Sequence, residues 1–80
     1  MTDLQICEVV ITAGDAGWLA DFTKALVADR LVACGHNIEM VRSIYRWDGE
    51  IQDEREARVN LHTRLALVDT IVERAARDHP

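Results

Sequence analysis

The chain has 80 residues, of which 49% are apolar, and its net charge at neutral pH is −5. This composition suits one globular domain over residues 1–80 rather than a disordered chain. The excess of acidic groups, 14 against 9 basic ones, argues against a nucleic-acid or anionic-membrane partner, because both require a basic surface.

No apolar run approaches the roughly 18 residues of a membrane span. The stretch from Met1 to Leu4 has no basic segment leading into a long apolar one, so we expect no secretory signal. Cys7 and Cys34 are too few for a disulfide framework, and a reducing cytoplasm is the expected compartment.

The first predicted element is a buried strand over Gln5–Thr12, which is rich in β-branched residues. Its unbroken apolar run, Val9-Val10-Ile11, predicts a central place in a sheet. A helix follows up to about Arg30, and Asp15 can cap its first turn. The apolar stripe of this helix comprises Leu19, Phe22, Ala25 and Leu26.

The segment Leu31–Trp47 contains a long strand that is clear from Ile38 onwards, with a bulge expected near Gly35–Glu39. Asp48-Gly49 then predicts a two-residue type I′ turn, in which both residues need positive φ. The chain returns in a second strand over Glu50–His62. This closure pairs Trp47 with Glu50, Tyr45 with Gln52 and Ser43 with Glu54.

The two faces of this hairpin differ in character, because side chains alternate along a strand. One face is expected to hold Ser43, Tyr45, Trp47, Gln52, Glu54 and Glu56. The apolar face is expected to collect Ile38, Met40, Ile44, Ala57, Val59 and Leu61.

Thr63 is expected to cap a second helix, whose last turn holds Arg74 and Arg77. Its apolar stripe comprises Leu65, Val68, Ile71, Val72 and Ala75. The order β-α-β-β-α predicts an α+β, ferredoxin-like split βαβ fold with a long hairpin and the final strand missing. An open sheet edge of this kind invites pairing with another chain.

Several short motifs occur at consistent spacing along nearly the whole chain. The most specific has the pattern Ser-x-Tyr-x-Trp-x-Gly-x-Ile and reads Ser43-Ile44-Tyr45-Arg46-Trp47-Asp48-Gly49-Glu50-Ile51. The others are Thr12-Ala13, Leu31-Val32-Ala33-Cys34, Glu56, His62-Thr63 and His79-Pro80. With these motifs the chain resembles the CutA family of divalent-ion tolerance proteins.

The resemblance implies a homotrimer of ferredoxin-like subunits, similar in architecture to the PII signalling proteins, whose long hairpins exchange contacts around a threefold axis. It also implies a role in tolerance to divalent metals, copper in particular, and metal binding by some members. The family usually continues past the His-Pro pair with a fourth strand and a helix. We therefore expect a truncated or naturally shortened member.

In some relatives, copper binding involves a cysteine in the first strand and histidines just before the proline. Here the corresponding positions hold Ile11 and Asp78, and only His79 matches. His36 stands where asparagine is common and His62 where lysine is common. A copper site implied by the resemblance is therefore incomplete.

Cys34 and His36 are the first candidate metal ligands, because residues two apart on a strand point to one face. Thiolate sulfur and imidazole nitrogen suit copper or zinc. The open alternative is a small buried thiol beside a solvated or hydrogen-bonded histidine. His79 is a third candidate through the resemblance and its place at a helix C-terminus, whereas His62 is expected to be solvated.

A second candidate site lies on the polar face of the hairpin. Tyr45 and Trp47, with Ser43, Glu54 and Glu56, can line a small-ligand cleft between subunits. The favoured alternative is that they pack a subunit interface, where Tyr and Trp are enriched.

Two functions follow as hypotheses. The first is a CutA-like homotrimer that binds divalent metal or acts in metal tolerance. The second is a PII-like regulatory or scaffold module that binds a small ligand at subunit clefts. We expect no enzyme, because no third group is seen to orient His36 beside Cys34 and Gly14 stands alone without a phosphate-binding loop.

Overall fold

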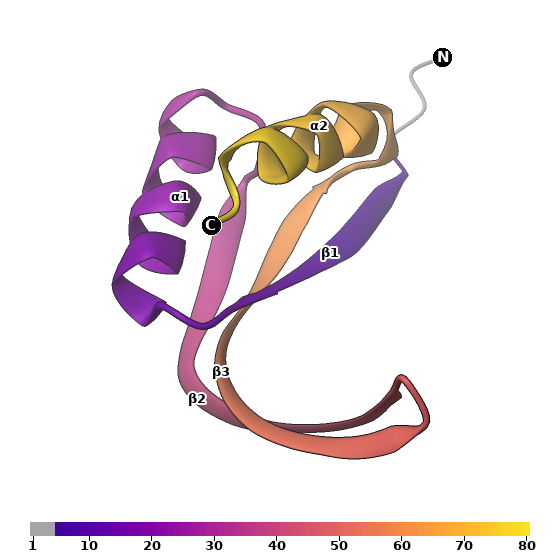
Figure 1. Cartoon of the computed structure of the whole chain (residues 1–80). Coiled ribbons are helices and arrows are strands. Elements are labelled where there is room, and N and C mark those ends of the chain that lie inside the picture. Colours follow the sequence, from indigo (N-terminus) through magenta and orange to yellow (C-terminus); the bar gives the residue numbers. More distant parts are fainter. Residues whose placement is uncertain (1–4) are drawn as a thin grey trace.

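The computed structural model describes residues 5–80 and confirms the predicted order of elements (Figure 1). The elements are β1 (Ile6–Ala13), α1 (Ala16–Ala28), β2 (Cys34–Trp47), β3 (Glu50–Arg64), the short 3-10 helix η1 (Leu65–Leu67) and α2 (Val68–Asp78). The strands form an antiparallel sheet in the order β1-β3-β2. Beyond the helices, β2 and β3 continue as a long curved hairpin. The chain has the ferredoxin-like α+β architecture expected.

The hydrophobic core lies between the two helices and one face of the sheet. Side chains alternate along β3, so Ala57, Val59, Leu61 and Thr63 are buried while the residues between them lie on the opposite face. The helices contribute Leu19, Phe22, Leu26 and Ile71 to this core. Neither α1 nor α2 covers the other face of the sheet, which is called the open face below.

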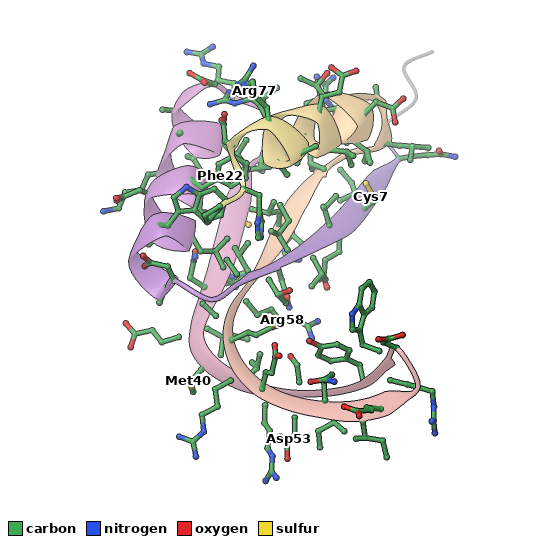
Figure 2. The ribbon with its side chains drawn as sticks, viewed as in Figure 1. Cys7, Phe22, Met40, Asp53, Arg58 and Arg77 are labelled. Atoms are coloured by element: carbon green, nitrogen blue, oxygen red, sulfur yellow. The ribbon has the colours of Figure 1, made fainter. Side chains whose placement is uncertain are left out.

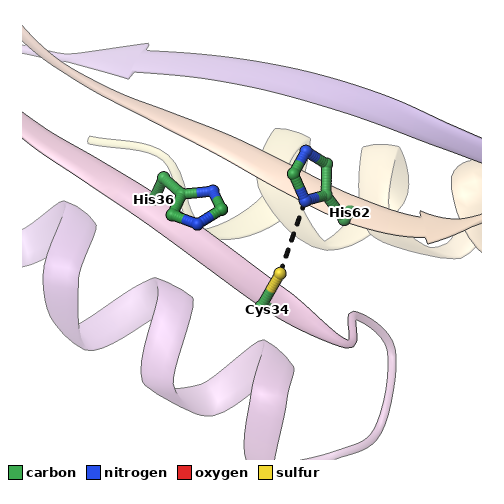
Figure 3. A group of neighbouring side chains, drawn as sticks. All are labelled: Cys34, His36 and His62. Atoms are coloured by element: carbon green, nitrogen blue, oxygen red, sulfur yellow. Dashed lines mark hydrogen bonds between the residues drawn. The ribbon is translucent and has the colours of Figure 1, made fainter.

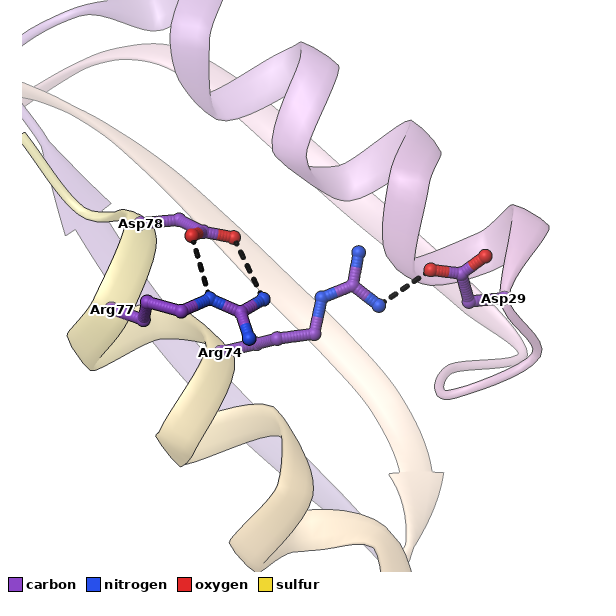
Figure 4. A network of polar contacts seen from close by, with 4 residues as sticks. All are labelled: Asp29, Arg74, Arg77 and Asp78. Carbon is purple, nitrogen blue, oxygen red and sulfur yellow. Dashed lines mark hydrogen bonds and ion pairs between the residues drawn. The ribbon is translucent and has the colours of Figure 1, made fainter.

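The first helix begins as predicted, since Asp15 accepts a hydrogen bond from the Trp18 backbone N–H at 3.0 Å. Trp18 stacks on Phe22, with ring centroids 5.0 Å apart; Figure 2 labels Phe22 on the side of α1 that faces the sheet. An ion pair between Asp29 and Arg74 joins the end of α1 to α2, beside the pair of Arg77 with Asp78 (Figure 4).

The hairpin confirms the predicted turn and register. Asp48 and Gly49 have φ of 51° and 78°, and Trp47 pairs with Glu50. The pairing is irregular between Ile38 and Val41, slightly later than the bulge expected. Two residues of β2 there oppose one residue of β3, so the pairing on the far side is displaced by one position.

The sequence expectations for the place of β1 and for the cap of α2 are wrong. The first strand is an edge of the described sheet, because β1 pairs with β3 alone; its Val10 lies on the open face and is 44% exposed. Thr63 lies within β3 and donates to the Leu31 carbonyl at 2.6 Å, while α2 begins after Leu67 without a side-chain cap. The extended backbone therefore continues past the expected helix cap.

The expected apolar face of the hairpin is also corrected. Ala57, Val59 and Leu61 are buried, but Ile38, Met40 and Ile44 are not, with exposed fractions of 42%, 60% and 63%. The bulge places Ile38 opposite Arg58, and the rest of the hairpin extends beyond the helices. Met40 projects from the convex side of its curve (Figure 2).

Neither helix in the described range has the length and apolarity to span a membrane.

Candidate metal centre

Three potential metal ligands converge on the open face of the sheet. The ligand atoms of Cys34, His36 and His62 all lie within 4.8 Å of one another. Cys34 and His36 come from the start of β2 and His62 from the end of β3 (Figure 3). The structure therefore brings two of the three predicted ligands together with a histidine that was expected to be solvated.

The contacts within this group are close. The Cys34 Sγ lies 3.4 Å from Nδ1 of His62 and is hydrogen-bonded to it. The imidazole rings of His36 and His62 meet edge to face, with centroids 5.2 Å apart. The Cys34 thiol is free and solvent-accessible, and the His62 side chain is 37% exposed. An ion can therefore reach all three groups from solvent.

The bulge in β2 creates this arrangement. With the register set by the turn, Cys34 would lie opposite Thr63, whose side chain points into the core. The irregularity after Ile38 shifts the pairing by one residue, so Cys34 lies opposite His62. Since a one-residue shift exchanges the two faces of a strand, it turns Cys34 and His36 to the open face with His62.

A carboxylate completes the row across the sheet. Glu8 on β1 pairs directly with His62, and its Oε2 lies 3.0 Å from the His62 Nε2. Glu8, His62 and Cys34 thus form one line across all three strands, with the imidazole in the middle.

The spacing of these donors fits a metal ion. Bonds of about 2.3 Å to sulfur and 2.0–2.1 Å to nitrogen at a tetrahedral angle place the two donor atoms about 3.5 Å apart. The observed separation between Cys34 Sγ and His62 Nδ1 is 3.4 Å. The ligand atom of His36 lies within 4.8 Å of both of these donors, so the three residues offer a three-donor set.

His79 lies elsewhere in the fold. Its Nε2 is 2.7 Å from the carbonyl oxygen of Thr12, its Nδ1 is 2.9 Å from that of Pro80, and its ring packs edge-on against Trp18. Both ring nitrogens thus face backbone acceptors, and the side chain fastens the end of α2 to the end of β1. The structure does not bring His79 together with Cys34 and His36.

The second predicted set lies together on one face of the outer hairpin. Ser43 donates a hydrogen bond to Glu56 at 3.2 Å. A hydrogen bond to Glu54, together with burial and the charges of Glu54 and Glu56, raises the pKa of Tyr45. Tyr45 and Trp47 are 40% and 70% exposed, so this surface of aromatic and acidic groups remains open to a partner.

Sequence reasoning missed His62 and Glu8. The period-two pattern Arg58, Asn60, His62 is a strand signal that runs to the expected end of the second hairpin strand at His62. That signal would have placed His62 on the open face. The pairing of β1 with β3 carries no comparable local signal, so Glu8 could not be assigned to the site.

Comparison with known proteins identifies relatives of this chain. A family model described as "CutA1 divalent ion tolerance protein" matches residues 7–80. The divalent-cation tolerance protein CutA of Thermus thermophilus is 33% identical over 72 residues, covering 90% of this chain and 70% of that protein. Protein CutA of Mus musculus is 33% identical over 60 residues, but the match spans 34% of the mouse protein and 75% of this chain.

Solved structures agree with these sequence matches. The divalent cation tolerance protein from Thermus thermophilus superposes with a TM-score of 0.89 at 32% identity, covering 95% of this chain and 74% of its own. A stable CutA1 from a psychrotrophic Shewanella gives a TM-score of 0.86 at 26% identity, covering 100% of this chain and 74% of its own. The backbone described above is therefore shared with experimental structures.

Proposed function

This chain belongs to the CutA1 divalent ion tolerance family, and from that membership we propose that it forms a cytoplasmic homotrimer that binds divalent metal, copper foremost. We propose Cys34, His36 and His62 as the ligands. The family is one of divalent ion tolerance proteins, so we propose that the ion is bound and released without a reaction.

The observation that carries the metal proposal is the convergence of one thiol and two imidazoles within 4.8 Å. Sulfur and nitrogen donors favour copper and zinc over magnesium or calcium, which prefer oxygen. Among first-row divalent ions, copper binds such donors most tightly. The donor chemistry therefore agrees with the ion that the resemblance implies.

Three protein donors suit an ion that is taken up and released. Structural zinc sites are closed by four protein ligands, whereas a three-ligand site keeps one position open. Cys34 and His36 are both exposed on the open face, so the ion stays in contact with solvent.

The homotrimer is supported by the exposed apolar groups of the hairpin. Trp47 and Ile51 at its tip are 70% and 69% exposed, and Ile44 is 63% exposed. A two-stranded ribbon is marginally stable alone in water, so further packing is needed to hold it. We propose that Ser43, Tyr45, Trp47, Glu54 and Glu56 contact a neighbouring subunit.

Copper and zinc titrations of the purified chain test the metal proposal. We expect one ion per subunit, and a loss of affinity in Cys34→Ser and His62→Ala that exceeds the roughly 10–100-fold cost of losing an outer-shell partner. His79→Ala is the matched control and should retain full affinity. If Cys34→Ser and His62→Ala bind as tightly as the wild type, these residues are not the ligands.

The solution mass tests the assembly. A homotrimer has about three times the chain mass of 9.0 kDa, and light scattering after gel filtration should report that value. Trp47→Glu should shift the mass toward one subunit, while Glu39→Gln, on the same strand, should not. A monomeric wild-type chain would contradict the proposal.

The second function, a PII-like module that binds a small ligand at subunit clefts, is favoured by the aromatic and acidic surface around Tyr45. Aromatic faces and carboxylates together attract organic cations. Chemical shifts of Tyr45 and Trp47 in the presence of a quaternary ammonium such as choline would test it. Shifts confined to these residues support the ligand cleft, and no shifts support a purely structural surface.

A further inference from the structure

The orientation of the His62 ring follows from its partners on either side. A carboxylate can only accept hydrogen bonds, so the His62 Nε2, 3.0 Å from the Glu8 Oε2, carries the proton of the neutral ring. The Nδ1 lone pair then faces the Cys34 Sγ at 3.4 Å. The neighbours thus select one of the two tautomers.

This tautomer is the one that a metal ion needs. An ion that binds Cys34 takes the place of the thiol proton and lies between Sγ and Nδ1, where the lone pair already points. Metal-bound histidines commonly donate their other N–H to a carboxylate, which fixes the ring and raises its basicity. Glu8 occupies this outer position.

Glu8 cannot easily be a ligand itself. Its carboxylate contacts Nε2, on the opposite side of the ring from the atom that faces Cys34. To reach an ion beside Sγ it would have to leave His62. The cross-strand pairing of Glu8 with His62 also holds it in place.

We propose that Glu8 is a positioning residue that holds His62 in the Nε2–H tautomer and so directs Nδ1 at the ion. This inference rests on the metal site proposed above. It assigns the first strand a part in the site, so all three strands of the sheet contribute to it.

Two readouts on Glu8→Ala test the role. Nitrogen NMR of the metal-free chain should show a single Nε2–H tautomer for the neutral His62 ring in the wild type and a mixture in Glu8→Ala. Zinc affinity should fall by about 10–100-fold. Glu8→Gln, whose amide oxygen can still accept from Nε2, should restore the tautomer and part of the affinity.

Glu39→Ala is the control, because it removes the same charge from an exposed strand position and should alter neither readout. An unchanged tautomer in Glu8→Ala overturns the inference, even if affinity falls. Unchanged zinc affinity with a mixed tautomer also overturns it, because the hydrogen bond from His62 to Glu8 would then have no effect on metal binding. A wild type that binds neither zinc nor copper refutes both the proposed function and the role of Glu8 toward an ion. If the wild type binds metal and only the predictions for Glu8→Ala fail, the proposed function stands and the role of Glu8 does not.

Discussion

Gly35 lies between the two ligands of β2, and its replacement by alanine should destabilise the chain. A Cβ at this position would lie 2.6 Å from Cγ2 of Thr23, 3.1 Å from Cδ2 of Leu61 and 3.2 Å from Cγ2 of Val59. The first distance is far below van der Waals contact. The strand that carries Cys34 therefore packs against α1 at a point where only glycine fits.

The clash has no inexpensive relief. Rotating the Thr23 side chain would break its hydrogen bonds, because its hydroxyl donates to the Leu19 carbonyl at 2.8 Å and accepts from Asn37 at 3.3 Å. Overpacking of a well-packed core costs about 1–3 kcal/mol. In a domain of this size, 1 kcal/mol corresponds to about 4–8 °C in Tm.

Thermal unfolding followed by circular dichroism, at matched protein concentration, measures this effect. Gly35→Ala should lower Tm by at least about 4 °C. Gly14→Ala is the control, since a Cβ there has nothing within 4 Å, and it should be neutral or slightly stabilising. If the two variants melt together, the close packing of β2 on α1 is wrong.

Three further predictions concern single interactions. Tyr45 is the one tyrosine of the chain, and because its hydrogen bond to Glu54 raises its pKa, ultraviolet titration should show that it ionises above pH about 10. The contribution of this hydrogen bond to stability is present below that pH and is lost as pH rises through the folded pKa of Tyr45. Glu54→Gln should lower the titration midpoint, and an unchanged midpoint would contradict the contact. The hydrogen bond from Arg42 lowers the pKa of Asp53. This pair therefore stabilises the hairpin above pH about 3.9, and its contribution is lost as pH falls through the lower folded pKa. Arg42→Gln should raise the pKa of Asp53 in a carbon NMR titration, and an unchanged pKa would refute the pair. Asp15→Ala should cost about 0.5–2 kcal/mol in urea unfolding, because α1 loses its N-terminal cap; wild-type stability would show that the cap contributes nothing.

Local chemistry made much of the hairpin predictable. Asp48-Gly49 sets the turn, and the turn sets the pairs from Trp47 with Glu50 back to Ser43 with Glu54. The position of the bulge was less well defined, because it depends on how β2 bends around the core. Its one-residue shift decides which side chains share the open face, so the exposure of Ile38 was predicted wrongly.

The candidate site was predictable only in part. Cys34 and His36 share a face because they are two apart on a strand, and this needs no tertiary information. His62 joins them through a strand pairing across 28 positions, and Glu8 through one across 54. Contacts at such separations depend on sheet order, which no single stretch of sequence specifies.

X-ray absorption at the zinc edge of the loaded chain tests the central claim most directly, because it identifies the ligand atoms. We predict one sulfur at about 2.3 Å and nitrogen neighbours at about 2.0–2.1 Å, with the sulfur shell lost in Cys34→Ser and retained in His79→Ala. A wild-type spectrum with no sulfur shell would contradict a metal site at Cys34, His36 and His62.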